Sequence, residues 1–168
     1  MDTIDILGAN RFEVYTKVRE ACRGIVLREG EILLSYERNT DQWFLPGGGL
    51  EAGENLLQCC QRELAEETGF LVEPEKHFLT INEYYEEWKF VSHYFQCRIT
   101  GKTPRQLTAR EAEVGLEPRW LPLQEAVAIF SRHQEYADNE MKQGAYLREF
   151  RALCAFLEEM GGSYGNTK

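Results

Sequence analysis

The sequence predicts an α/β (α+β) fold, an α/β/α sandwich with helices on both faces of a mixed, mostly antiparallel sheet. The β-favouring runs "ACRGIVL" and "EILLSYE" are joined only by "REG", which indicates a hairpin. A helical pattern over residues 54–68 follows a glycine-rich loop, and a second amphipathic helical pattern covers about residues 139–160. Because strands and helices alternate irregularly, we expect the helices to cover both faces of one sheet.

The glycine-rich loop and the helix after it are the most clearly marked segment. "QWFLPGGG" predicts a short strand that runs into a loop, since Pro46 cannot donate a hydrogen bond and three glycines follow. In the predicted helix, Leu57, Cys60 and Leu64 stand at i, i+3 and i+7, so they should form a buried stripe. Gly69 then supplies a left-handed C-terminal cap.

The second half of the chain predicts a long hairpin followed by shorter elements. "HFLTINEYYEEWKFVSHYFQCRIT" indicates two strands that turn near Glu86 to Lys89. The polar stretch "TGKTPRQLTAREAEVGLEPRW" is broken by Pro104 and Pro118, so we expect a surface loop. "RWLPL" predicts a short strand and "LQEAVAIF" a short helix.

The length of the chain fits one domain, which we expect to cover residues 1–168. About residues 1–15 should form an N-terminal extension, and about residues 139–160 a C-terminal helix. The glycine-rich residues 161–168 should form a flexible tail.

The amino-acid composition limits which partners and which cellular compartment we expect for the protein. There are 19 Lys and Arg against 28 Asp and Glu, a net charge of −9, and no basic cluster, which argues against a nucleic acid duplex as partner. No apolar run approaches the roughly 20 residues needed to cross a bilayer, so we expect no membrane association. The five cysteines include no CxxC pair, which favours free thiols and a cytoplasmic location.

Three glutamates crowd the end of the predicted helix. Around a helix Glu63 is offset from Glu67 by about 40° and from Glu66 by about 60°, so all three carboxylates share one flank. Like charges at i,i+4 cost a helix roughly 0.2–0.5 kcal/mol per pair, and Arg62 can relieve only part of this repulsion. The cluster is either a solvated acidic face or a site for Mg²⁺, which prefers oxygen ligands and substrate phosphates.

The residues around this cluster match the pattern G-x5-E-x7-R-E-U-x-E-E-x-G-U, where U is a bulky apolar residue. On this pattern the chain resembles the Nudix hydrolase family (MutT-like), and every specified position agrees. The resemblance implies a Nudix-type sandwich with the Nudix loop-helix-loop. The matching residues are Gly48, Glu54, Arg62, Glu63, Leu64, Glu66, Glu67, Gly69 and Phe70.

The resemblance implies hydrolysis of a nucleoside diphosphate linked to another moiety, a small-molecule substrate, with Mg²⁺ or Mn²⁺ as cofactor. Glu63, Glu66 and Glu67 would then be the metal ligands, with a backbone carbonyl of Gly47 or Gly48 beside them. These enzymes neutralise the pyrophosphate with the metal and use it to activate water.

Other residues of the pattern receive supporting roles. Arg62 would orient the glutamates by a charge-assisted hydrogen bond. Because Glu54 stands in the first helical turn, about 180° from Glu63, it should not join the metal cluster and instead favours the positive end of the helix dipole. The resemblance implies a structural role for it. Gly69 should likewise be structural.

The catalytic base and the substrate contacts lie partly outside the pattern. The base is either Glu63 or an acidic residue before Trp120, where we choose Glu113 over its neighbours in the same loop. Arg38 would hold a phosphate or be a surface residue at a strand end. Several aromatic residues could stack on a base or simply pack in the sheet. The other loop acids are Glu111 and Glu117, and the aromatic candidates are Trp43, Tyr84, Tyr85 and Trp88.

Two other functions compete with hydrolysis. A non-catalytic Nudix domain that senses a nucleotide is the main alternative, although pure binding needs no triple carboxylate. An isomerase of the isopentenyl diphosphate type would need a dedicated cysteine and metal-binding histidines, which have no counterpart in the sequence. Homodimers are common in the family, so a homodimer is an assembly that the resemblance allows.

Overall fold

The computed structural model describes residues 1–161, so all but the first residue of the expected tail lies outside the described part. Strands and helices alternate irregularly along the chain, as predicted. The elements are β1 (Asp2–Leu7), β2 (Lys17–Arg28), β3 (Glu31–Glu37), β4 (Gln42–Phe44), β5 (Gly47–Gly49), α1 (Leu56–Thr68), β6 (Phe70–Tyr85), β7 (Trp88–Lys102), α2 (Ala109–Glu113), β8 (Leu116–Pro122), α3 (Leu123–Ser131), the 3₁₀ helix η1 (Arg132–Tyr136) and α4 (Glu140–Glu159).

The sheet is mixed and mostly antiparallel, which confirms the predicted fold class. Its strands follow the order β1-β6-β7-β2-β3-β4, while β5 pairs with β2 and β8 with β3. Among the strand pairs within residues 1–161, only β1–β6 and β2–β7 are parallel. The predicted hairpin at "REG" is present, and Leu27 pairs with Ile32 across it.

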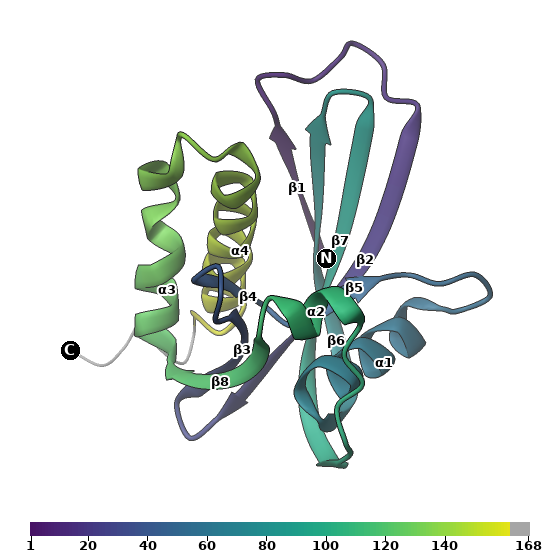
Figure 1. Ribbon diagram of the computed structural model, residues 1–168, viewed down its shortest axis with the longest axis vertical. Helices are drawn as coiled ribbons and strands as arrows, with labels where there is room; N and C mark the ends of the chain where they lie inside the picture. Colours follow the sequence, from purple (N-terminus) through teal and green to yellow (C-terminus); the bar gives the residue numbers. More distant parts are fainter. Residues whose placement is uncertain (162–168) are drawn as a thin grey trace.

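Helices cover both faces of the sheet. In Figure 1, α1 lies on one side of the strands, α3 and α4 lie on the other, and the ends of β1, β2 and β7 extend beyond the helices. Ile25 of β2 belongs to the core that includes α3 and α4, whereas Cys22 and Val26 belong to the core under α1. Because side chains alternate between the two faces of a strand, β2 contributes residues to both cores.

Several predicted elements differ in extent. The expected glycine loop contains a strand, because Gly47–Gly49 pair with residues 21–23 of β2. The expected surface loop before Trp120 contains the short helix α2, and β8 is longer than "RWLPL". The first residues do more than extend the chain, since β1 joins the sheet beside β6.

The stripe predicted for α1 is partly wrong. Cys60 and Leu64 are buried, but Leu57 is 49% exposed, and Cys59 is buried in its place. The helix begins at Leu56 and packs on β2, β5 and β6, so its buried face is rotated by part of a turn from the predicted one. All five cysteines carry free thiols. In the described part of the chain, no helix is long and apolar enough to cross a membrane.

Candidate active site

The start of α1 places Glu54 outside the helix. Asn55 is the N-cap, and its side chain accepts a hydrogen bond from the Gln58 amide at 2.8 Å in a capping box. The prediction that Glu54 occupies the first helical turn is therefore wrong. Its carboxylate instead accepts two hydrogen bonds from Arg62, at 2.7 and 3.0 Å. The Arg62 hydrogen bond holds the pKa of Glu54 down at about 2.

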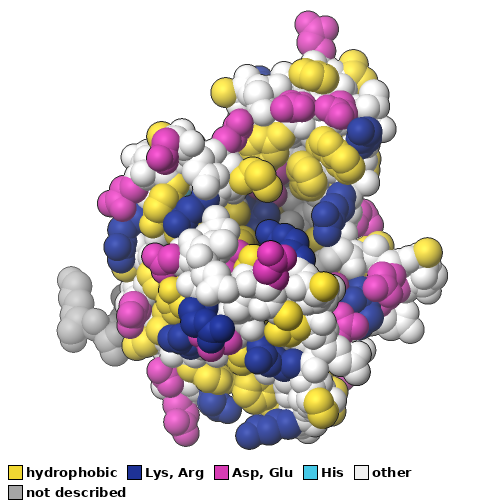
Figure 2. All heavy atoms as spheres, in the orientation of Figure 1, with side chains coloured by type: hydrophobic (Ala, Val, Ile, Leu, Met, Phe, Trp, Pro, Cys, Tyr) yellow, Lys and Arg dark blue, Asp and Glu magenta, His cyan; other side chains and the backbone are white. Residues whose placement is uncertain are grey.

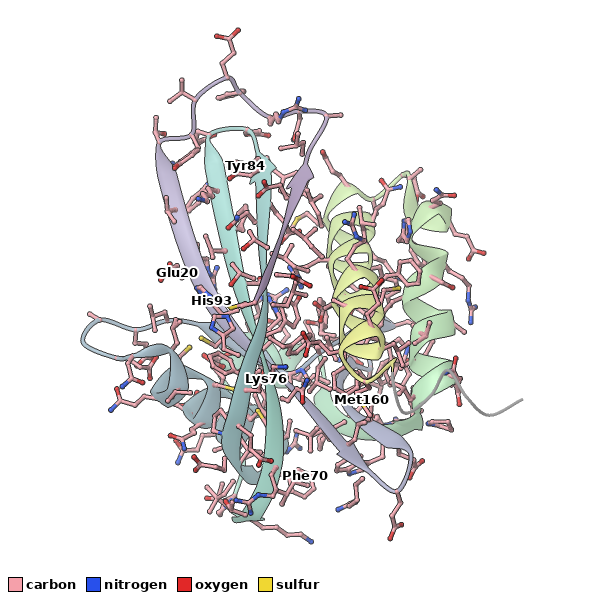
Figure 3. All side chains as sticks on the ribbon, turned by 180° about the vertical axis from the view of Figure 1, so that it is seen from behind. Glu20, Phe70, Lys76, Tyr84, His93 and Met160 are labelled. Carbon is pink, nitrogen blue, oxygen red and sulfur yellow. The ribbon has the colours of Figure 1, made fainter. Side chains whose placement is uncertain are left out.

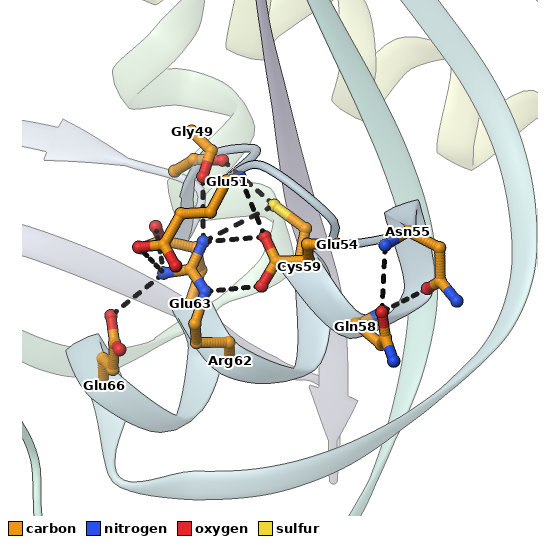
Figure 4. Close-up of polar contacts among 10 residues, drawn as sticks. Gly49, Glu51, Glu54, Asn55, Gln58, Cys59, Arg62, Glu63 and Glu66 are labelled. Atoms are coloured by element: carbon orange, nitrogen blue, oxygen red, sulfur yellow. Dashed lines mark hydrogen bonds and ion pairs between the residues drawn. The ribbon is translucent and has the colours of Figure 1, made fainter.

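Arg62 is the centre of the polar network in Figure 4. Its Nη1 donates to Glu63 at 2.9 Å and to Glu66 at 3.2 Å, while Nη2 donates to the Gly49 carbonyl at 2.9 Å. The guanidinium thus joins the loop before the helix, the glycine strand and two of the three clustered glutamates. These contacts are charge-assisted and directional.

Glu67 points the other way, into the protein. It is only 6% exposed, and its Oε2 accepts the Gly47 amide hydrogen at 2.7 Å. Burial raises the pKa of Glu67 well above its ordinary value, although the Gly47 hydrogen bond acts against this shift. A buried carboxylate with one amide donor has spare capacity to bind a cation.

The glycine strand fits closely against the glutamates. A Cβ on Gly48 would lie 2.5 and 2.6 Å from the two carboxylate oxygens of Glu63, so only glycine leaves room there. The Gly48 carbonyl accepts a weak hydrogen bond from the Cys59 thiol at 3.6 Å. Gly47 turns its amide toward Glu67, whereas a carbonyl ligand was expected from Gly47 or Gly48.

The chemistry of the donors suits a divalent cation, but the three carboxylates do not converge. Within residues 1–161 no three His, Cys, Asp or Glu side chains are gathered to hold a metal ion. Arg62 engages Glu63 and Glu66, while Glu67 faces Gly47. For Glu63, Glu66 and Glu67 to bind one metal ion together, Glu63 and Glu66 would first have to release the Arg62 guanidinium.

The polar loop before Trp120 places Glu111 near enough for its charge to act on Glu63 and Glu67. Burial is the main cause of the raised pKa of Glu63 and Glu67, and the charge of Glu111 adds to it at both. Glu111 also closes the capping box of α2, accepting the Thr108 amide hydrogen at 2.9 Å. Glu113 is exposed, and its backbone carbonyl accepts a hydrogen bond from Asn39.

Within residues 1–161, none of the three substrate contacts expected from sequence forms a hydrogen bond or ion pair with the clustered glutamates. Arg38 lies against Gly115 beyond the end of β3, where its Nη2 would be 3.2 Å from a Cβ at that glycine. Trp43 packs on Tyr36, with ring centroids 4.2 Å apart. Tyr84 lies near the protruding end of the sheet, as Figure 3 shows, far along β6 from α1.

Sequence analysis missed Arg23, which lies beside the site. Its charge lowers the pKa of Glu67 against the larger effect of burial, and a Cβ on Gly47 would lie 2.7 Å from the Arg23 Cα. The available signal was an arginine inside the β-favouring run "ACRGIVL", where the flanking residues are apolar or small.

The sequence matches a family model and several curated relatives. The NUDIX domain model matches residues 18–142. The human 8-oxo-dGDP phosphatase NUDT18 is 35% identical over 98 residues, which are 56% of this chain and 29% of that protein. The putative ADP-ribose pyrophosphatase YjhB of Bacillus subtilis (strain 168) is 29% identical over 104 residues, which are 61% of this chain and 48% of that protein.

The fold is shared with a solved structure as well. The solution structure of the E. coli ORF135 protein superposes with a TM-score of 0.61 at 20% identity, covering 89% of this chain and 96% of that one. Because the NUDIX model covers most of the sequence, this chain belongs to the NUDIX family. It spans less than a third of NUDT18 and about half of YjhB.

Proposed function

We propose that this chain is a hydrolase dependent on Mg²⁺ or Mn²⁺ that cleaves the diphosphate bond of a nucleoside diphosphate joined to another group. The observation that carries the proposal is the buried Glu67 carboxylate, held against Gly47 beside Glu63. Membership of the NUDIX family supports the reaction class.

Glu63, Glu66 and Glu67 would hold the cation, whose positive charge neutralises the diphosphate and lowers the pKa of water. In the reaction a water oxygen forms a bond to one phosphorus, and the bridging P–O bond breaks. One proton of that water passes to a carboxylate base. Glu63, Glu111 and Glu113 are the candidate bases, and the electrostatic effect of Glu111 on the glutamates favours Glu111 over Glu113.

The names of two relatives supply the first substrates to test. One relative is described as acting on 8-oxo-dGDP and another as a putative ADP-ribose pyrophosphatase. We therefore propose a screen of 8-oxo-dGDP, ADP-ribose, nucleotide sugars and nucleoside triphosphates with Mg²⁺ and Mn²⁺. We expect release of a nucleoside monophosphate, which chromatography of the reaction mixture detects.

Glu67→Gln tests the assigned chemistry, because it removes the charge and keeps the shape. We expect kcat to fall on the order of 100-fold or more on any substrate that the wild type cleaves. Glu73→Gln is the matched control, since Glu73 is exposed on β6, and it should keep its activity. Unchanged turnover in Glu67→Gln would overturn the proposal. Tight nucleotide binding by a wild type that releases no product would favour a sensing domain instead.

A further inference from the structure

The sheet ends on one side at β1, and the outer edge of this strand is free. Within residues 1–161, β1 pairs only with β6, and no element is drawn over it in Figure 3, which shows the molecule from behind. A free edge presents a row of unpaired backbone N–H and C=O groups, which can pair with a strand of another chain. The edge of β1 is therefore a candidate surface for pairing between molecules.

Two other edges of the sheet are protected in ways that β1 is not. At the opposite end, β4 is only three residues long, and the amide of its central residue, Trp43, donates to the Tyr146 hydroxyl of α4 at 3.0 Å. Residues 70–78 of β6, which precede the part paired with β1, include Pro74 and lie where the strand register shifts. Short strands, proline and irregular register are common protections of an edge. In contrast, β1 has six residues, an unbroken register and no proline.

A two-fold pairing of β1 with itself has one register that the sequence favours. Opposite residues of an antiparallel pair point to the same face, so a two-fold axis perpendicular to the sheet must pass through a residue position and not between two of them. An axis at Asp5 would put two like charges opposite each other, which destabilises a strand pair. An axis at Ile4 puts Ile4 opposite itself and Thr3 opposite Asp5 of the second copy. An axis at Thr3 would leave the end of β1 unpaired.

The register centred on Ile4 also covers exposed apolar side chains. It places Leu7, which is 58% exposed, opposite Met1 of the second copy, which is 74% exposed. Figure 2 shows further hydrophobic side chains on the part of the sheet that extends beyond the helices, and Phe12 and Val14 in the loop after β1 are more than half exposed. Single exposed apolar side chains are normal, but a group of them beside a free edge is typical of a protein–protein contact.

The groove between β1 and α4 carries both signs of charge. The residues that line it include Arg151 and Glu158 of α4 and Asp2 of β1. A two-fold contact brings the same surface of two copies together, so a surface with both signs can complement itself, whereas a purely acidic one would repel its copy. This balance distinguishes the groove from the chain as a whole, whose net charge is −9.

We propose that the chain forms a two-fold homodimer in which the β1 strands of two copies pair antiparallel about Ile4 and join the two sheets into one. Backbone hydrogen bonds along the edge would supply the affinity, and the opposing side chains would set the register. The candidate active site stays open in this assembly, because β6 and β7 lie between β1 and β2, the strand with which the glycine strand β5 pairs. The homodimer does not depend on the reaction that the site performs.

Sedimentation equilibrium of the full chain over a range of concentrations tests the homodimer. We expect the wild type to show the mass of two chains and to dissociate on dilution. Thr3→Asp puts a second acidic side chain opposite Asp5 at two symmetric positions, so it should weaken dimerisation at least about tenfold. Thr3 is exposed, so this variant should keep its fold and its hydrolysis per chain. Thr100→Asp, on an exposed threonine of β7, is the matched control and should dimerise like the wild type.

A charge swap tests the register itself. Adding Asp5→Lys to Thr3→Asp makes the cross-strand pair attractive, so the double variant should dimerise within about threefold of the wild type. Hydrogen exchange should show the amides of β1 protected in the wild type and less protected on dilution or in Thr3→Asp, which distinguishes pairing at this edge from a dimer made elsewhere. A wild type that is monomeric at every concentration, or a dimer that Thr3→Asp leaves intact, would overturn the proposal without affecting the proposed hydrolysis.

Discussion

At the scale of single residues, Arg62 decides how the acidic cluster is tolerated. The Arg62 guanidinium contacts Glu54, Glu63 and Glu66 within 3.2 Å, so its single positive charge is shared among three carboxylates. Glu67 lies outside this network and is neutralised less, because its main partner is a backbone amide. The residue with the least compensation is thus the one with the clearest demand for a cation.

The pair between Glu54 and Arg62 predicts a loss of stability in acid. The pKa of Glu54 in the folded protein is about 2, below the roughly 4.3 of a free glutamate. The pair therefore stabilises the fold fully above about pH 5, and this contribution disappears as the pH falls toward 2. After screening by solvent, we expect Glu54→Gln to cost on the order of 1–2 kcal/mol at pH 7 and almost nothing at pH 2.

Urea unfolding of the wild type and of Glu54→Gln, at several pH values, measures this difference. Glu73→Gln, on an exposed glutamate of β6, should show no such trend. An equal gap between wild type and Glu54→Gln at pH 7 and pH 3 would mean that the carboxylate charge contributes nothing.

At the scale of elements, two glycines have a left-handed backbone but differ in how crowded their surroundings are. Comparing substitutions at the two positions distinguishes the cost of backbone conformation from the cost of a steric clash. Gly69 caps α1 with φ of +75°, and its added Cβ would lie 2.9 Å from the Thr103 carbonyl oxygen. Gly53 has φ of +79°, but a Cβ there would meet nothing within 4 Å. The cap of α1 is therefore tied to the end of β7 by close packing as well as by backbone conformation.

Substitution by alanine tests this difference. Gly53→Ala should cost about 1 kcal/mol, which is the price of a left-handed conformation alone. Gly69→Ala should cost more than Gly53→Ala, because the Cβ also presses on a backbone oxygen. Thermal unfolding of both variants measures the two losses of stability. Equal losses would show that the backbone at Thr103 moves away from the added Cβ without cost.

At the scale of the whole molecule, α4 holds the segment that leads into the glycine strand. Glu149 is fully buried, and its Oε2 accepts the Leu45 amide hydrogen at 2.5 Å across 104 positions of the chain. Its Oε1 accepts hydrogen bonds from Tyr94 at 2.6 Å and Arg148 at 3.0 Å. Burial acts to raise the pKa of Glu149, but Arg148 and Arg23 outweigh it, so the pKa lies below its ordinary value.

Removing this charge should destabilise the protein strongly. A buried ion pair that loses one partner costs about 3–5 kcal/mol, so Glu149→Gln should lower the free energy of unfolding by that order. Glu158→Gln, on the exposed side of α4, should change it by less than about 0.5 kcal/mol. Chemical unfolding of both variants provides the measurement, and equal effects would mean that the buried carboxylate is not the anchor.

The local features of the fold were predictable because they depend on residues close together in the chain. The hairpin at "REG", the long hairpin of β6 and β7, the cap at Gly69 and the range of α4 all follow from patterns a few residues long. Leu57 was misplaced because helical periodicity defines a stripe but not the rotation at which the sheet receives it. Glu54 was misplaced because the capping box at Asn55 and Gln58 competed successfully for the helix start.

The sequence by itself determined the family, through the spacing of the glycine, glutamates and arginine around α1, and with it the class of chemistry to test. Only the tertiary structure decided that β1 joins the sheet beside β6, that Glu111 acts on the glutamates and that Arg23 lies beside Glu67. Those contacts join residues tens of positions apart. Their strength depends on burial and on the approach of separate strands, which no short pattern in the sequence encodes.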